Sequence, residues 1–227
     1  ANKALLMLLL VVLGAAFTWK AFFDSIPTDP SAGFTLPTSI IVWMAIGGIG
    51  GLIASLVVIF SPKSAPIAAP IYAVLEGLFL GAISAFFAYQ YTGNIIIQAV
   101  GLTFITFFLM LTAYRSGWIK VTEKFKTIIL VATGAIGIMY FLSFILGMFG
   151  VTIGFLHSNG PLGIGISVVI IAIAALNLLL DFDFIEKASS QGAPKYMEWF
   201  GAFGLMVTLI WLYIEFLRLL SKLYSRD

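Results

Sequence analysis

Residues 39–60 read SIIVWMAIGGIGGLIASLVVIF, an apolar run that contains no charged residue. A helix needs about 20 mostly apolar residues to cross the hydrocarbon core of a bilayer, so this run predicts a transmembrane helix. The apolar residues follow one another without alternation, which argues against a strand of a membrane barrel.

Six further stretches of the chain have the same length and apolar character. The segments between them are charged or rich in helix breakers, such as SPKS at 61–64 and SSQGAP at 189–194. The sequence therefore predicts an all-α integral membrane protein with seven transmembrane helices in a single domain over residues 1–227. The other six stretches are Ala4–Phe23, Pro66–Phe87, Ile95–Tyr114, Thr127–Phe149, Leu162–Asp181 and Trp199–Leu220.

The composition agrees with this class. Hydrophobic residues make up 61% of the chain and charged residues 10%, whereas soluble domains carry roughly 25% charge. Lipid must then be the solvent for most of the surface, and membrane lipids are the expected partners. The chain lacks the kind of basic stripe that would indicate nucleic-acid binding. The chain has no cysteine, and His157, its one histidine, is predicted to be a solvated loop residue.

The basic residues predict the orientation of the chain. With seven spans, eight lysines and arginines fall on one side and four on the other, which places the N-terminus in the cytoplasm. The basic C-terminal residues then lie outside, against the rule, and a last segment that re-enters the membrane instead of crossing it is the alternative that would relieve this conflict. The eight are Lys3, Lys63, Arg115, Lys120, Lys124, Lys126, Lys187 and Lys195, and the four are Lys20, Arg218, Lys222 and Arg226.

Small residues gather on three of the predicted spans. They let helix backbones approach closely, so we expect packing within the molecule, with a dimer interface as the alternative. The oligomeric state stays open. The residues are Gly47, Gly48, Gly50, Gly51, Gly134, Gly137, Gly163, Gly165, Ala172 and Ala175.

Glu76 lies about ten residues inside the third predicted span. A charge at the centre of a membrane helix costs roughly 2.5–3.5 kcal/mol on insertion scales. We therefore expect Glu76 to face other helices and to bind a proton or a cation, with a neutral, hydrogen-bonded packing residue as the alternative.

Asp181 and Asp183 close the predicted sixth span, where the negative end of the helix dipole opposes a carboxylate. Asn177 lies one turn before Asp181 and shares its face, whereas Asp183 points roughly the opposite way. Asp181 is the stronger candidate for ion or proton binding, and a solvated helix end is the alternative for Asp183. A salt link from these acids to the basic 115–126 segment is a further option.

Glu215 lies late in the seventh span, and Arg218 follows at a spacing that allows an ion pair. An interfacial ion pair and an ion-binding carboxylate are both open readings. The sequence lacks a Walker A motif and has no lysine inside the last span before Lys222. It also lacks two aspartates on different helices that could face each other as a catalytic pair. The sequence therefore predicts that the protein is not an enzyme.

Three segments resemble the Bax inhibitor motif family, in its bacterial YccA-like branch. They are APIYAVLEGLFLGAIS at 69–84, LDFDFIE at 180–186 and WLYIEFLRLL at 211–220. The resemblance implies six helices packed around the last, and a gate in which an aspartate of the sixth helix pairs with one of the seventh. Asp181 matches the first aspartate, but the second falls at Thr208.

The resemblance implies a pH-sensitive calcium or cation leak channel of the bacterial inner membrane. Glu76 or Glu215 is then expected to replace the missing aspartate beside Asp181, and Asp181 with Glu76 is the candidate calcium site. No other cofactor is expected. A non-transporting protein that modulates a membrane-bound protease or a cell-death response is the second hypothesis, and a proton-coupled transporter is the third.

Overall fold

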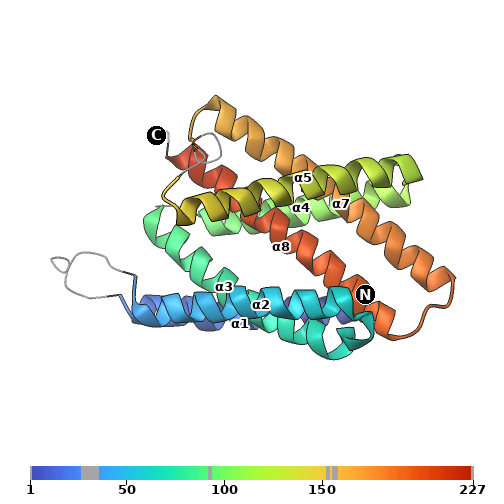
Figure 1. The fold of residues 1–227 in the computed structure, drawn as a ribbon, viewed down its shortest axis with the longest axis horizontal. Helices are drawn as coiled ribbons and strands as arrows, with labels where there is room; N and C mark the ends of the chain where they lie inside the picture. The colour runs from blue at the N-terminus through green and yellow to red at the C-terminus, as the bar shows by residue number, and fades with distance from the viewer. Residues whose placement is uncertain (1, 27–35, 92–93, 152–153, 155–157, 226–227) are drawn as a thin grey trace. The chain divides into compact units, whose positions relative to one another are not determined.

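The computed structural model describes residues 2–26, 36–91, 94–151, 154 and 158–225 (Figure 1). Within them, seven long helices are apolar enough to cross a membrane, which confirms the predicted fold class. A short 3-10 turn, Pro62–Ser64, leads into the third. The helices are α1 (Asn2–Asp24), α2 (Thr38–Phe60), α3 (Ala65–Gln90), α4 (Ile95–Arg115), α5 (Glu123–Met148), α7 (Pro161–Ser190) and α8 (Tyr196–Tyr224).

The end of α7 differs from the prediction. The helix continues past Asp181 to Ser190 and stops before Gly192, whose φ of +64° suits glycine. Asp181 and Asp183 thus lie inside the helix, and the argument from the negative helix end was wrong for both. The predicted end followed the fall in hydropathy, but a helix persists through polar residues until a breaker ends it.

The chain divides into two compact units. Unit 1 comprises Ala1–Gly93 and Lys187–Met206, and unit 2 comprises Asn94–Glu186 and Val207–Asp227. Helix α8 contributes its first part to unit 1 and its second part to unit 2.

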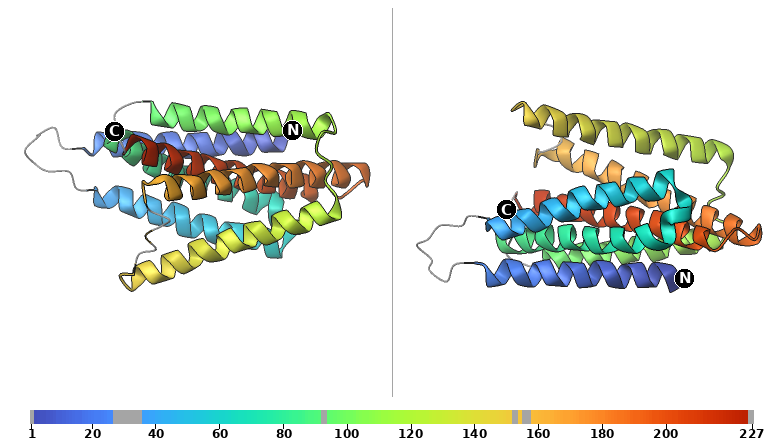
Figure 2. Two further views of the ribbon diagram at one scale, coloured as in Figure 1. Left: turned by 90° about the horizontal axis from the view of Figure 1, so that it is seen from above. Right: turned by 60° about the horizontal axis from the view of Figure 1, so that its bottom comes forward.

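In unit 1, α1 and α2 both pack along α3 (Figure 2). Glycines make the approach close: a Cβ at Gly14 would lie 2.7 Å from the carbonyl oxygen of Val74, and one at Gly47 would lie 2.6 Å from that of Leu75. Gly77 and Gly81 of α3 face the backbone of α1 in the same way. Small residues therefore set the helix spacing here.

The predicted packing role of small residues holds for α2 but not throughout. Gly47 and Gly51 are buried against α3. A Cβ at Gly134, Gly137 or Gly165 would meet no atom of the described residues within 4 Å. Composition shows which residues permit close packing, but the partner helix decides which of them are used.

In unit 2, α7 and the second part of α8 carry the buried side chains. Leu178 and Leu179 of α7 and Leu212 of α8 are completely buried. The ring of Phe182 on α7 lies 5.7 Å from that of Phe107 on α4. Apolar packing of this kind fixes the direction in which the polar residues of α7 and α8 point.

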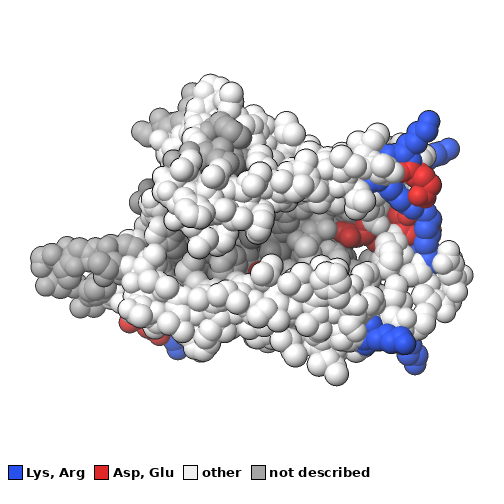
Figure 3. All heavy atoms as spheres, in the orientation of Figure 1, with Lys and Arg blue, Asp and Glu red and all other residues white. Residues whose placement is uncertain are grey.

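Large apolar side chains cover the outside of the helices. Phe60, Ile67 and Leu130 are each more than two-thirds exposed. Most of the face drawn in Figure 3 carries no charge. Protein surfaces that face water rarely carry so large a continuous apolar area. This surface is therefore suited to contact with lipid acyl chains.

Candidate functional site

Asp181 of α7 meets Thr208 of α8 within unit 2. The Thr208 hydroxyl donates a hydrogen bond of 2.6 Å to Oδ2 of Asp181. Asp181 is half-buried and Thr208 is buried. In the part of the chain that the structure describes, Asp181 forms no ion pair. The chain therefore places a carboxylate inside a span with a neutral donor as its partner.

Asn177 extends this polar group by one turn along α7. Its Nδ2 donates to Oγ1 of Thr133 on α5 at 2.7 Å and to the carbonyl oxygen of Ile173 at 2.9 Å. Side chains of α5, α7 and α8 thus contribute to one polar layer inside unit 2. We call Thr133, Asn177, Asp181 and Thr208 the Asp181 layer.

Asp183 faces away from this layer, as its spacing predicts. Its Oδ2 lies 3.0 Å from Nζ of Lys126 near the start of α5, and Lys126 also pairs with Glu123 at 2.9 Å. Asp183 is 8% exposed, so the predicted solvated helix end does not describe it. Its charge is balanced by the basic 115–126 segment, as the predicted salt link requires.

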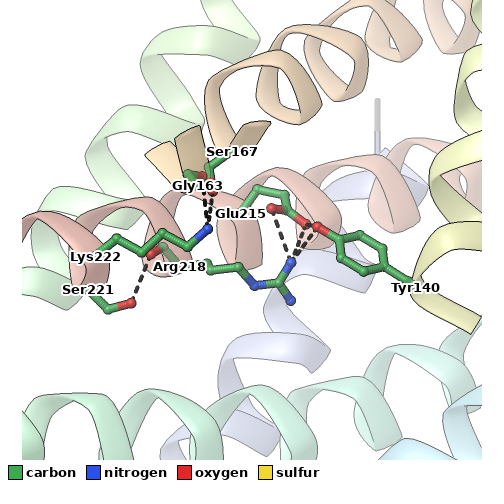
Figure 4. Close-up of polar contacts among 7 residues, drawn as sticks. All are labelled: Tyr140, Gly163, Ser167, Glu215, Arg218, Ser221 and Lys222. Carbon is green, nitrogen blue, oxygen red and sulfur yellow. Dashed lines mark hydrogen bonds and ion pairs between the residues drawn. The ribbon is translucent and has the colours of Figure 1, made fainter. Parts of the chain in front are cut away.

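Glu215 is 1% exposed and belongs to a separate polar group (Figure 4). Its Oε1 accepts hydrogen bonds from the Tyr140 hydroxyl at 2.7 Å and from Nη1 of Arg218 at 3.0 Å. Nη1 of Arg218 also donates to the Tyr140 hydroxyl, and its guanidinium lies over the tyrosine ring. Glu215 therefore has a cation of its own chain beside it.

Two helical turns separate Glu215 from Thr208, a rise of about 10 Å along α8. The carboxylate of Asp181 bonds to Thr208, and that of Glu215 bonds to Tyr140 and Arg218. The polar contacts of the two acids are therefore made with different residues at different levels of unit 2.

Lys222 is 5% exposed, although its sequence position indicated only a helix end. Its Nζ donates to the carbonyl oxygen of Gly163 at 3.0 Å and to Oγ of Ser167 at 2.9 Å, both on α7 (Figure 4). The spacing of Glu215, Arg218 and Lys222 in the sequence already indicates this position. Residues 215, 218 and 222 share one face of a helix, so a polar stripe continues along α8.

Glu76 of α3 lies in unit 1 and is half-buried. A Cβ at Gly51 would lie 3.1 Å from its Oε1, so the carboxyl group lies against α2. Within the described residues it makes no hydrogen bond or ion pair. Asp181 belongs to the other unit, so their pairing stays a prediction. His157 lies outside the described residues.

The chemistry of the Asp181 layer suits a proton or a loosely held cation. The layer consists of two hydrogen-bonded pairs, Asp181 with Thr208 and Asn177 with Thr133, one turn apart along α7. Calcium takes six to eight oxygen ligands in proteins, and the described residues hold no group of three or more acidic, histidine or cysteine side chains. A calcium ion at this layer would keep most of its water.

The model of a protein family described as Bax inhibitor 1 like matches residues 1–225, which is nearly the whole chain. No curated protein and no solved structure matches the chain at a significant level. The family match agrees with the resemblance in the segments 69–84, 180–186 and 211–220, and it does not distinguish a bacterial branch.

Proposed function

This chain belongs to the Bax inhibitor 1-like family of multi-pass membrane proteins, and from that premise we propose that it forms a pH-sensitive leak pathway for cations. Calcium is the permeant ion that we propose. The Asp181 layer would be the proton-responsive element of the pathway, with Asp181 as the titrating group and Thr208 and Asn177 as its polar neighbours.

The observation that supports this proposal is the state of Asp181. Charges inside spans mark ion paths or proton relays by default, because an unbalanced charge there is costly. Asp183 and Glu215 are balanced by Lys126 and Arg218, whereas the polar partner of Asp181 is the neutral hydroxyl of Thr208. A proton or a passing cation is then the natural counter-charge for Asp181.

Protonation of Asp181 would change the α7–α8 contact. The ionised carboxylate only accepts hydrogen bonds, whereas the neutral acid also donates one, and the Thr208 hydroxyl can serve either state by rotating. The charge at the layer changes by one unit in the same step. A cation is attracted to the ionised layer and loses that attraction when the proton binds.

We expect Asp181→Asn to flatten the pH dependence of calcium flux, because asparagine has nearly the same shape and does not titrate. The measurement uses the purified full chain in liposomes from about pH 5 to about pH 8. Asp183→Asn is the matched control, since its acid is paired with Lys126, and it should keep the pH dependence.

Two results contradict the proposal. If the wild-type protein passes no calcium at any pH in this interval, the leak function fails and the interaction-protein hypothesis takes its place. If Asp181→Asn responds to pH as the wild type does, the Asp181 layer is not the proton-responsive element. A flux that requires a second, co-transported solute would favour the proton-coupled transporter.

A further inference from the structure

Among the described residues, the guanidinium of Arg218 forms hydrogen bonds through only one of its three nitrogens. Nη1 makes all of its hydrogen bonds, to Glu215 and to the Tyr140 hydroxyl. Among the described residues, Nη2 and Nε make none. The side chain is 37% exposed, whereas that of Glu215 is 1% exposed. Glu215 and Tyr140 therefore hold Arg218 through one nitrogen of its guanidinium, and Figure 4 draws no contact at the other two among its labelled residues.

The formal charges around Arg218 do not cancel. Arg218 and Lys222 carry two positive charges and Glu215 one negative charge, which leaves one positive charge at this end of α8. Among the described residues, Lys222 bonds only to neutral oxygens, those of Gly163 and Ser167. An excess charge near the hydrocarbon core is costly, so the group is suited to one added negative charge.

Exposed aromatic side chains follow Tyr140 along α5, as suits a surface in contact with lipid. Phe141 and Phe144, which follow Tyr140 on α5, are 62% and 68% exposed. Arg218 lies six residues before the end of α8, a rise of about 9 Å, so its long side chain can reach the headgroup level. An anion reaching Nη2 and Nε there would come from the membrane surface.

We propose that Arg218 binds the phosphate of a membrane phospholipid through its Nη2 and Nε. A phosphodiester carries one negative charge, and its oxygens match the fork of a guanidinium in a two-bond contact. Glu215 and Tyr140 act as positioning residues that hold the planar group, and Lys222 adds the second positive charge. This inference does not depend on ion flux.

The test uses the purified, delipidated full chain in detergent. Short-chain phosphatidylglycerol should raise the thermal unfolding midpoint in a saturable manner, because a ligand that binds only the folded state stabilises it. The matched diacylglycerol, which lacks phosphate, and inorganic phosphate, which lacks acyl chains, are the two comparison ligands. Both should be ineffective at the same concentration.

Arg218→Lys keeps the charge and the partner at Glu215 but loses the fork. We expect it to weaken the apparent affinity for phosphatidylglycerol by about tenfold or more. Arg115→Lys is the matched control, because Arg115 is exposed at the end of α4, and it should leave the affinity unchanged. If Arg218→Lys does not fold, the double variant Glu215→Gln with Arg218→Gln removes the pair together and should also lose the lipid effect.

Three outcomes overturn the proposal. An equal effect of diacylglycerol would mean that the acyl chains alone bind. An equal effect of inorganic phosphate would assign the site to a free anion and not to a lipid. An unchanged affinity in Arg218→Lys, or in the double variant, would place the phosphate elsewhere on the protein.

Discussion

At the scale of single residues, three acids of unit 2, Asp181, Asp183 and Glu215, differ in the group that balances their charge. Asp183 faces Lys126, Glu215 faces Arg218, and Asp181 faces the hydroxyl of Thr208. Thr208 occupies the position where the family resemblance implies a second aspartate. Within unit 2, the proposed proton binding at this layer would therefore involve one carboxyl group and a neutral partner.

Thr208→Val tests the weight of that single hydrogen bond. Valine has the size of threonine but offers no donor, and a hydrogen bond to a charged group contributes about 1.5–3 kcal/mol. We expect the unfolding midpoint to fall at neutral pH, as measured on the purified protein in detergent. Thr208→Ser keeps the hydroxyl and should restore most of the loss, and a midpoint equal to wild type in the valine variant would contradict the role of this bond.

At the scale of helices, two kinds of contact hold the elements. In unit 1, glycines of α1, α2 and α3 bring backbones together, whereas in unit 2 polar links such as Asn177 to Thr133 and Lys222 to Ser167 join the helices. Without a hydrophobic drive between helices in lipid, close packing and hydrogen bonds are two of the main sources of helix association.

Gly81→Ala should destabilise the α1–α3 contact. The added methyl group would overlap the Ala15 carbonyl oxygen and the Thr18 hydroxyl, and overpacking costs typically about 1–3 kcal/mol. Gly137→Ala is the matched control in α5, where an added Cβ would meet no atom of the described residues within 4 Å. It should be neutral or stabilise by about 0.5–1 kcal/mol, the usual helical preference for alanine. Thermal unfolding of both variants measures the difference, and equal midpoints would refute the packing argument.

At the scale of the whole molecule, the structure changes which basic residues should be counted when the membrane orientation is predicted. The predicted outer side holds four of them, and two of these, Arg218 and Lys222, are engaged within unit 2. The positive-inside rule concerns charges in loops. With those two set aside, Lys20 and Arg226 remain on that side, so the asymmetry in favour of a cytoplasmic N-terminus grows and the conflict at the C-terminus becomes smaller.

Thiol labelling of intact cells tests this orientation. The chain has no cysteine, so Ser116→Cys and Asn94→Cys each carry a single thiol at an exposed position. We expect Ser116→Cys, beside the basic 115–126 segment, to resist an impermeant reagent added outside, and Asn94→Cys at the start of α4 to react. The reverse pattern would invert the topology.

The sequence by itself determined the seven helices and the acids that lie within them, because a span is a local property of about 20 consecutive residues. It also placed Asn177 on the face of Asp181 and Asp183 on the other, because helical spacing is local too. The end of α7 was misplaced, since loss of hydropathy does not end a helix.

Only the tertiary structure decided which side chains meet. Asp181 and Thr208 are 27 positions apart, and Tyr140 and Glu215 are 75 apart. Periodicity tells which face a residue occupies but not which helix lies opposite, because that depends on how the apolar and small residues of every helix pack at once. The contact of Asp181 with Thr208 and the burial of Lys222 follow from that packing.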